Sequence, residues 1–219
     1  MSKDLDEGYP GTLTIKVLYQ LTNANELKIE YWATTDSATI VNLTHHSFFN
    51  LKGAGNGTIN DHLLQINAAY YTPVDKGLIP TGKITTVQNT PFNFQKITVI
   101  GERLNTTNQQ LEYGRGYDHN FVLNQSLTGL NYAAKVIEPV SGRVMEVYTN
   151  EPGLQFYGGN FLDGTVKGKN GKAYKYRTAF CLESQHFPDS PNQDSFPTTR
   201  LDPNKKYYSI CIYKFSVLK

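Results

Sequence analysis

The sequence predicts an all-β fold, a large antiparallel β-sandwich, on three observations. Tyrosine (15), phenylalanine (11) and glycine (18) are abundant, a composition that favours strands and turns. Many short segments alternate apolar and polar residues between turn residues, and none keeps helical spacing over three turns. No repeat or low-complexity linker divides the chain, so we expect a single domain over residues 1–219.

The clearest element is a hairpin near the N-terminus. Apolar and polar residues alternate over residues 13–21 and again over residues 27–33, and Thr-Asn-Ala-Asn joins the two runs. Further strands are expected at residues 39–43, 62–68, 83–88, 96–101, 118–124, 132–138, 143–149, 153–158, 178–183 and 207–217. Residues 70–82, 105–116 and 164–175 are expected to be loops or irregular segments.

The stretch Thr-Ala-Phe-Cys-Leu-Glu-Ser-Gln-His-Phe-Pro-Asp-Ser-Pro-Asn, residues 178–192, has an unusual charge placement. Strand alternation directs Phe180 and Leu182 to one face and Cys181 and Glu183 to the other. A carboxylate that closes such a strand, just before a proline-rich turn, suits a pocket. A surface or rim acid fits the same pattern, so the residues alone leave both interpretations open.

Two other stretches place ionisable groups among aromatic or glycine residues. His45-His46-Ser47 precedes Phe48, and Gly-Tyr-Asp-His-Asn spans residues 116–120. The spacing matches no common zinc pattern, so we expect no metal, and no Gly-x-Ser-x-Gly elbow indicates a serine hydrolase.

A carboxylate, a histidine and nearby rings remain, and these suit a polyhydroxylated ligand. Asp118 offers a bidentate acceptor for hydroxyls, and Phe48 or Tyr157 offers an apolar surface for a sugar ring. The alternative is that each histidine only satisfies a hydrogen bond within a loop.

Charge and cysteine content exclude several classes of partner. The net charge is +2 and no Lys/Arg cluster is expected to follow a groove, so we expect no nucleic-acid partner. No N-terminal apolar run and no 18-residue apolar stretch are present, so we expect no membrane association and a cytoplasmic location. Cys181 and Cys211 are then expected to be buried, reduced thiols.

Three motifs resemble those of the aldose 1-epimerase (galactose mutarotase) family. They are Asn-Leu-Thr-His-His-Ser-Phe-Phe-Asn-Leu at 42–51, Gly-Tyr-Asp-His-Asn-Phe-Val-Leu at 116–123, and Phe-Cys-Leu-Glu-Ser-Gln-His-Phe-Pro-Asp-Ser-Pro-Asn at 180–192. Shorter matches are Glu-Gly-Tyr-Pro-Gly-Thr-Leu at 7–13, Glu-Val-Tyr-Thr at 146–149 and Gln-Phe-Tyr-Gly-Gly-Asn-Phe-Leu-Asp-Gly at 155–164. The resemblance spans nearly the whole chain, in order.

The resemblance implies a β-supersandwich that interconverts the α and β anomers of aldohexoses such as galactose and glucose. It implies that Glu183 is the general base on the C1 hydroxyl and His46 the general acid on the ring oxygen, placed to flank one sugar. The residues implied to bind substrate are Asp118, Gln155, Ser47 and Phe48. Neither a cofactor nor a metal is implied.

The chain departs from the family pattern at three places. His45 stands where the family usually has Asn, and Phe48 where it usually has Tyr. Roughly the first third of the family chain, about the size of a small domain, precedes the motif found here at 7–13 and supplies an arginine and a second histidine. We therefore expect an N-terminally shortened sandwich with weak or no activity by itself, either self-associating or pairing with a separate N-terminal segment.

Two other functions stay open on the sequence. One is a non-catalytic sugar-binding or regulatory module, which a Glu183→Ala variant would separate from an enzyme. The other is an epimerase of phosphorylated hexoses, which needs a basic rim for which only Arg115 and Arg177 are suitably placed.

Overall fold

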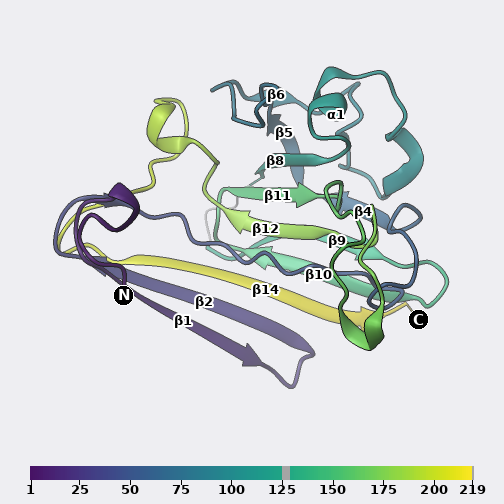
Figure 1. Ribbon diagram of the computed structural model, residues 1–219, viewed down its shortest axis with the longest axis horizontal. Coiled ribbons are helices and arrows are strands. Elements are labelled where there is room, and N and C mark those ends of the chain that lie inside the picture. Colours follow the sequence, from purple (N-terminus) through teal and green to yellow (C-terminus); the bar gives the residue numbers. More distant parts are fainter. Residues whose placement is uncertain (125–128, 219) are drawn as a thin grey trace.

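The computed structural model describes residues 1–124 and 129–218, and its architecture is two packed antiparallel sheets (Figure 1). A seven-stranded sheet has the order β1-β2-β14-β10-β9-β4-β7, and a five-stranded sheet has the order β12-β11-β8-β5-β6. A small ribbon pairs β13 with β3. The predicted all-β antiparallel sandwich is confirmed.

The strands of the seven-stranded sheet are β1 (Leu13–Leu21), β2 (Glu26–Thr35), β4 (Leu63–Ile66), β7 (Thr98–Val99), β9 (Asn131–Ile137), β10 (Arg143–Thr149) and β14 (Tyr207–Val217). Those of the five-stranded sheet are β5 (Ala68–Thr72), β6 (Thr85–Thr86), β8 (Asp118–Leu123), β11 (Gly153–Tyr157) and β12 (Cys181–Gln185). The ribbon is β3 (Thr39–Ile40) with β13 (Arg200–Leu201). The single α-helix among the described residues is α1 (Gln109–Tyr113), and short 3₁₀ turns cover Asp6–Gly8, Ile100–Arg103, Lys169–Gly171 and Ser190–Asn192.

Apolar side chains from the facing sheets form one continuous core. The seven-stranded sheet contributes Ile29, Leu64, Val136, Met145 and Val147, and the five-stranded sheet contributes Phe121, Leu154, Phe156 and Leu182, all at most 1% exposed. Burying one such side chain stabilises the fold by about 1.5–3 kcal/mol, so this interface holds the two sheets together.

The strand expected over residues 96–101 ends at Val99, where the 3₁₀ turn Ile100–Arg103 begins. Two other sequence-based expectations about elements were also wrong. The segment expected as one strand over residues 62–68 is two strands, because the chain crosses from one sheet to the other at Asn67. The Asn67 side chain donates to the Tyr132 carbonyl at this corner, and β5 then continues into the segment expected as a loop. Residues 105–116, expected to be irregular, contain α1, whose N-cap Asn108 accepts from the Gln110 and Leu111 amides.

The five-stranded sheet has a polar outer face. Gln155 lies opposite Glu183 and Asn120, and Tyr157 lies opposite Cys181 and Asp118. Paired residues in antiparallel strands point the same way, so these six side chains share one face, while the intervening residues enter the core.

Among the described residues, no helix has the length and apolarity needed to cross a membrane.

Candidate active site

Glu183 lies in the middle of β12, on the polar face of the five-stranded sheet. The residue is 7% exposed, and burial is the main reason that its pKa rises to about 8. The negative charge of Asp118 raises it further. A carboxyl group tuned this close to neutral pH can both take up and release a proton there.

Residues 42–50 lie alongside β12 without forming a regular strand, and side-chain and backbone hydrogen bonds hold them. Asn42 donates to the His186 carbonyl and accepts from the His186 amide, both at 3.0 Å. The Thr44 hydroxyl donates to the Ser184 carbonyl at 2.9 Å, and Phe49 exchanges two backbone hydrogen bonds with Phe180. These attachments fix the position of His46 relative to β12.

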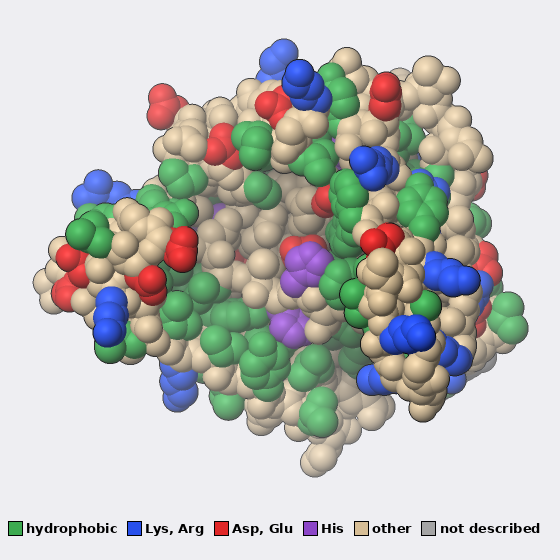
Figure 2. Space-filling model, viewed as in Figure 1, with side chains coloured by type: hydrophobic (Ala, Val, Ile, Leu, Met, Phe, Trp, Pro, Cys, Tyr) green, Lys and Arg blue, Asp and Glu red, His purple; other side chains and the backbone are tan. Residues whose placement is uncertain are grey.

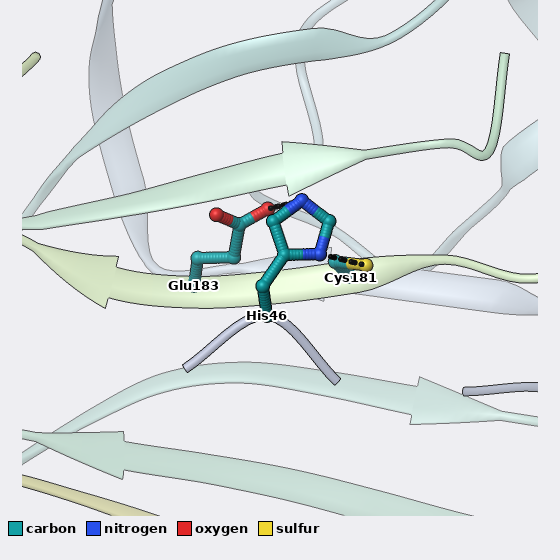
Figure 3. A group of neighbouring side chains, drawn as sticks. All are labelled: His46, Cys181 and Glu183. Carbon is teal, nitrogen blue, oxygen red and sulfur yellow. Dashed lines mark hydrogen bonds and ion pairs between the residues drawn. The ribbon is translucent and has the colours of Figure 1, made fainter. Parts of the chain in front are cut away.

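His46 projects from this segment over the polar face, with each ring nitrogen beside a residue of β12 (Figure 3). Nε2 lies 3.4 Å from Glu183 Oε1, and Nδ1 lies 3.3 Å from Cys181 Sγ. The His46 side chain is 52% exposed, whereas that of Glu183 is only 9% exposed. The histidine is therefore open to a ligand that reaches Glu183 from solvent.

Asp118 and Gln155 lie beside this pair on the same face. Gln155 Nε2 donates to Asp118 Oδ1 at 2.7 Å. Burial raises the pKa of Asp118, and the hydrogen bond from Gln155 and the proximity of His46 partly offset that rise. Within the described structure, the buried Oε1 of Gln155 has no hydrogen-bond partner, so the amide is an acceptor available to a ligand hydroxyl.

Aromatic rings form one wall of the site. The Phe48 ring centroid lies 5.0 Å from that of His46 and 6.1 Å from that of Tyr157, and Phe48 is about half exposed. Figure 2 shows a hollow in the middle of this side of the molecule, with histidine and acidic side chains at its floor and hydrophobic side chains around it. An apolar wall beside hydrogen-bonding groups suits the face and the rim of a sugar.

Ser47 makes its contact with a different neighbour. Its hydroxyl lies 3.1 Å from His45 Nε2, and the His45 ring packs against the rings of Tyr19 and Tyr213. A substrate-binding role for Ser47 therefore stays a prediction. The departure from the family pattern at position 45 places a histidine directly beside this hydroxyl.

His186, three residues after Glu183 in the same motif, makes its contact with Glu151 instead. His186 Nδ1 lies 2.5 Å from Glu151 Oε2, and the Tyr207 hydroxyl donates to the other Glu151 oxygen. The residues that could hold a metal are instead His46, Cys181 and Glu183, whose ligand atoms all lie within 4.8 Å of one another. The expectation of no metal, which came from spacing in the sequence, did not consider this grouping and stays a prediction.

Sequence reasoning missed two residues of this face, Cys181 and Asn120. The sequence predicts Cys181 only as a buried thiol and predicts no role for Asn120. Each lies two residues from a predicted site residue in the same strand, so strand alternation was the signal that pointed to both.

Comparisons with known proteins agree with this geometry. The chain is 48% identical over 217 residues to human galactose mutarotase, and 38% identical over 216 residues to the aldose 1-epimerase of Escherichia coli K12. These alignments cover 99% and 98% of this chain but 61% and 62% of those relatives, so the chain spans about three fifths of their length.

Solved structures give the same result. A GalM/aldose epimerase homologue from C. elegans superposes with a TM-score of 0.85 at 29% identity, covering 99% of this chain and 64% of that one. A galactose 1-epimerase from Lactobacillus acidophilus superposes with a TM-score of 0.84 at 30% identity, covering 100% and 61%. The family model described as aldose 1-epimerase matches residues 1–214, and this chain therefore belongs to the aldose 1-epimerase family.

Proposed function

We propose that this protein interconverts the α and β anomers of aldohexoses such as galactose and glucose by acid/base ring opening. The observation that carries the proposal is the 3.4 Å approach of His46 Nε2 to Glu183 Oε1 on a ligand-accessible polar face. Relatives named galactose mutarotase and aldose 1-epimerase support it, and they favour an enzyme over a non-catalytic sugar-binding module.

The spacing of the pair suits the two oxygens that must exchange protons. The expectation from sequence was that the two groups would flank one sugar, but at 3.4 Å they leave no room for a hexose between them. The C1 hydroxyl oxygen and the ring oxygen are bonded to the same carbon, so an acid and a base that reach both must themselves be close neighbours. The sugar would thus lie over the pair with its C1 edge toward the sheet.

In the proposed reaction, Glu183 removes the proton from the C1 hydroxyl while His46 delivers one to the ring oxygen. The bond between C1 and the ring oxygen breaks, and C1 becomes an aldehyde. Rotation about the C1–C2 bond presents the other face of the aldehyde to the hydroxyl that was the ring oxygen. Ring closure reverses both transfers: His46 takes the proton from the attacking hydroxyl, and protonated Glu183 returns its proton to the C1 oxygen, because the two groups exchange roles in the reverse step.

The pair carries one transferable proton throughout this cycle. Ring opening uses the pair as a carboxylate with an imidazolium, and ring closure uses it as a carboxylic acid with a neutral imidazole. A Glu183 pKa of about 8 keeps both states accessible near neutral pH. When the pair loses this proton at higher pH, we expect the rate to fall.

The remaining residues of the site would bind and orient the sugar. Asp118 and Gln155 would accept hydrogen bonds from ring hydroxyls, and Phe48 would pack against an apolar face of the ring. Ser47 would contribute a hydroxyl through the same loop as His46. We further propose a role in carbohydrate metabolism, including that of galactose, which the names of the relatives support. We also propose a cytoplasmic location, which the two free cysteines support.

Polarimetry on freshly dissolved α-D-galactose and α-D-glucose tests the proposal. The expectation from sequence that the chain has weak or no activity by itself stays a prediction, so every rate is measured at high protein concentration and compared with that of buffer. We expect acceleration over buffer, and a loss of about 10²–10⁴-fold of the catalysed rate in Glu183→Gln. Glu112→Gln, at an exposed acid of α1, is the matched control. Equal rates for wild type and Glu183→Gln would contradict the proposed role of Glu183.

A further inference from the structure

We propose that Cys181 is a positioning residue for this reaction, whose sulfur accepts a hydrogen bond from His46 Nδ1–H and so leaves Nε2 to exchange the proton with the sugar. The inference rests on the proposed function. It concerns which of the two imidazole nitrogens performs the proton transfer and what holds the other.

The geometry gives the two ring nitrogens different neighbours. Nδ1 lies 3.3 Å from Cys181 Sγ, within hydrogen-bonding distance for sulfur, and Nε2 lies 3.4 Å from Glu183 Oε1 (Figure 3). Cys181 and Glu183 are two residues apart in β12, so one strand presents a partner to each nitrogen. Cys181 is fully buried, and its backbone is held opposite Tyr157 in β11, so its sulfur has a fixed position.

Proton accounting decides the direction of the hydrogen bond. Nε2 must hold a proton before it protonates the ring oxygen, and must offer a lone pair when it takes that proton back. Nδ1 must then keep its hydrogen in both states, because a ring that lost both protons would be an anion. A thiol that donated to Nδ1 would fix the opposite tautomer, in which Nε2 cannot accept. The sulfur is therefore the acceptor, and its weakness as an acceptor leaves the imidazole free to change charge.

The surroundings keep this sulfur from competing for the proton. A cysteine beside a histidine commonly ionises to a thiolate that pairs with the imidazolium. Here burial, together with the negative charges of Glu183 and Asp118, raises the pKa of the Cys181 thiol far above its usual range. The Tyr157 hydroxyl, whose pKa burial also raises, adds no negative charge on this side. The thiol stays neutral, and the transferable proton remains with Glu183 and His46.

Long-range ¹H–¹⁵N correlation spectra of the imidazole rings measure the tautomer directly. The chain has five histidines, and a His46→Asn variant assigns the relevant signals. We expect neutral His46 to carry its hydrogen on Nδ1 in wild type and to shift toward the Nε2–H tautomer in Cys181→Ala. Cys181→Ser, which keeps a hydrogen-bonding atom on Cβ, is expected to retain the Nδ1–H tautomer. Cys211→Ala is the matched control, because Cys211 is the other buried free cysteine and lies in β14.

Anomer-exchange kinetics on the same variants give the functional readout. We expect Cys181→Ala to lower kcat about tenfold, the effect of losing one hydrogen bond, with little change in KM. Cys181→Ser is expected to recover most of that loss. A structural role alone would instead lower stability equally in Cys181→Ala and Cys211→Ala and leave the tautomer unchanged.

A wild-type His46 in the Nε2–H tautomer, or a Cys181→Ala variant with unchanged tautomer and unchanged kcat, would overturn the proposal. The two readouts also separate this inference from the function on which it rests. If Cys181→Ala changes the tautomer but wild type shows no anomer exchange, the hydrogen bond stands and the proposed function fails.

Discussion

The environment of Glu183 works against its ionisation in the folded protein. Its carboxyl group is buried near a second carboxylate, Asp118, and both features raise its pKa, from 4.5 to about 8. A carboxylate at this depth normally has a permanently cationic partner, whereas the nearest group here, the half-exposed His46 at 3.4 Å, is charged only when protonated. The buried acid is therefore a cost to stability that a functional role at this position explains.

This cost predicts a pH-dependent gain in stability for Glu183→Gln. Below about pH 4.5 the carboxyl group is protonated in both the folded and unfolded states, so the substitution changes little. As pH rises from about 4.5 to about 8, the unfolded chain ionises while the folded chain holds its proton. The wild type thus loses stability relative to the variant, by about 1.4 kcal/mol per unit of pKa difference.

Urea denaturation at about pH 5 and about pH 8.5 measures this effect. We expect the variant's advantage in free energy of unfolding to grow to a few kcal/mol at the higher pH. Glu112→Gln, at an exposed acid, should show no comparable growth. An advantage for Glu183→Gln that is equal at both pH values would argue against a raised pKa.

At the residue scale, the sequence motifs predicted most residues of the site, whereas strand alternation was the only signal for Cys181 and Asn120. The motifs suggested Glu183, His46, Asp118 and Gln155, and these four side chains lie together on one face. The contact of His46 with Cys181 joins residues 135 positions apart, and no local pattern encodes such a distance. The direction in which the Ser47 hydroxyl points could not be predicted either, because it depends on the His45 rotamer.

At the scale of elements, the segment 42–50 explains why a motif rich in hydrogen-bonding residues surrounds His46. Asn42 and Thr44 satisfy carbonyls of His186 and Ser184, and Phe49 pairs with Phe180. An irregular segment can place a side chain accurately only when such contacts replace a regular ladder. The precision of the His46 position thus depends on residues outside the Glu183–His46 pair.

Thr44 provides a test of that dependence. Thr44→Val keeps the shape of the side chain but removes the hydroxyl that donates to the Ser184 carbonyl. We expect a loss of about 1 kcal/mol in unfolding free energy and a fall in kcat, because His46 is held less firmly. Thr44→Ser keeps the donor and should lose much less of both. Equal behaviour of the two variants in denaturation and anomer-exchange assays would show that this hydrogen bond does not position His46.

Alternation predicted β2 and β14 well, because alternate residues of each strand are buried in the core. It failed at Asn67, where a change of sheet interrupts one continuous pattern, and at α1, which is too short for helical periodicity. The first failure concerns tertiary context that a window of sequence does not contain, and the second concerns the short length of the helix.

At the scale of the whole molecule, β1 leaves one edge of the seven-stranded sheet open (Figure 1). Ser2 pairs with Leu13 at the start of this edge, and the following residues of β1 have a partner only in β2 within the described structure. Val17, Tyr19 and Leu21 project from one face of β1 and are exposed, and Tyr19 reaches the ring of His45. An exposed apolar edge strand of nine residues is a template for association.

The expectation that residues 1–219 form a single domain stays a prediction.

We expect the protein to self-associate through β1. Sedimentation velocity at increasing concentration should show association in wild type, and Val17→Lys should shift the distribution toward monomer. Val140→Lys, at a valine that is 88% exposed in the β9–β10 turn, is the matched control and should behave like wild type. A wild-type protein that stays monomeric at every concentration would refute this prediction.

The central claim is that Glu183 and His46 act as one proton-transfer unit. Saturation-transfer NMR of the anomeric protons measures the exchange rate for wild type, Glu183→Gln, His46→Asn and the double variant. Because each group is useless without the other, we predict that the double variant is no slower than the slower single variant. Losses that multiply in the double variant, or single variants that exchange anomers at the wild-type rate, would contradict the account.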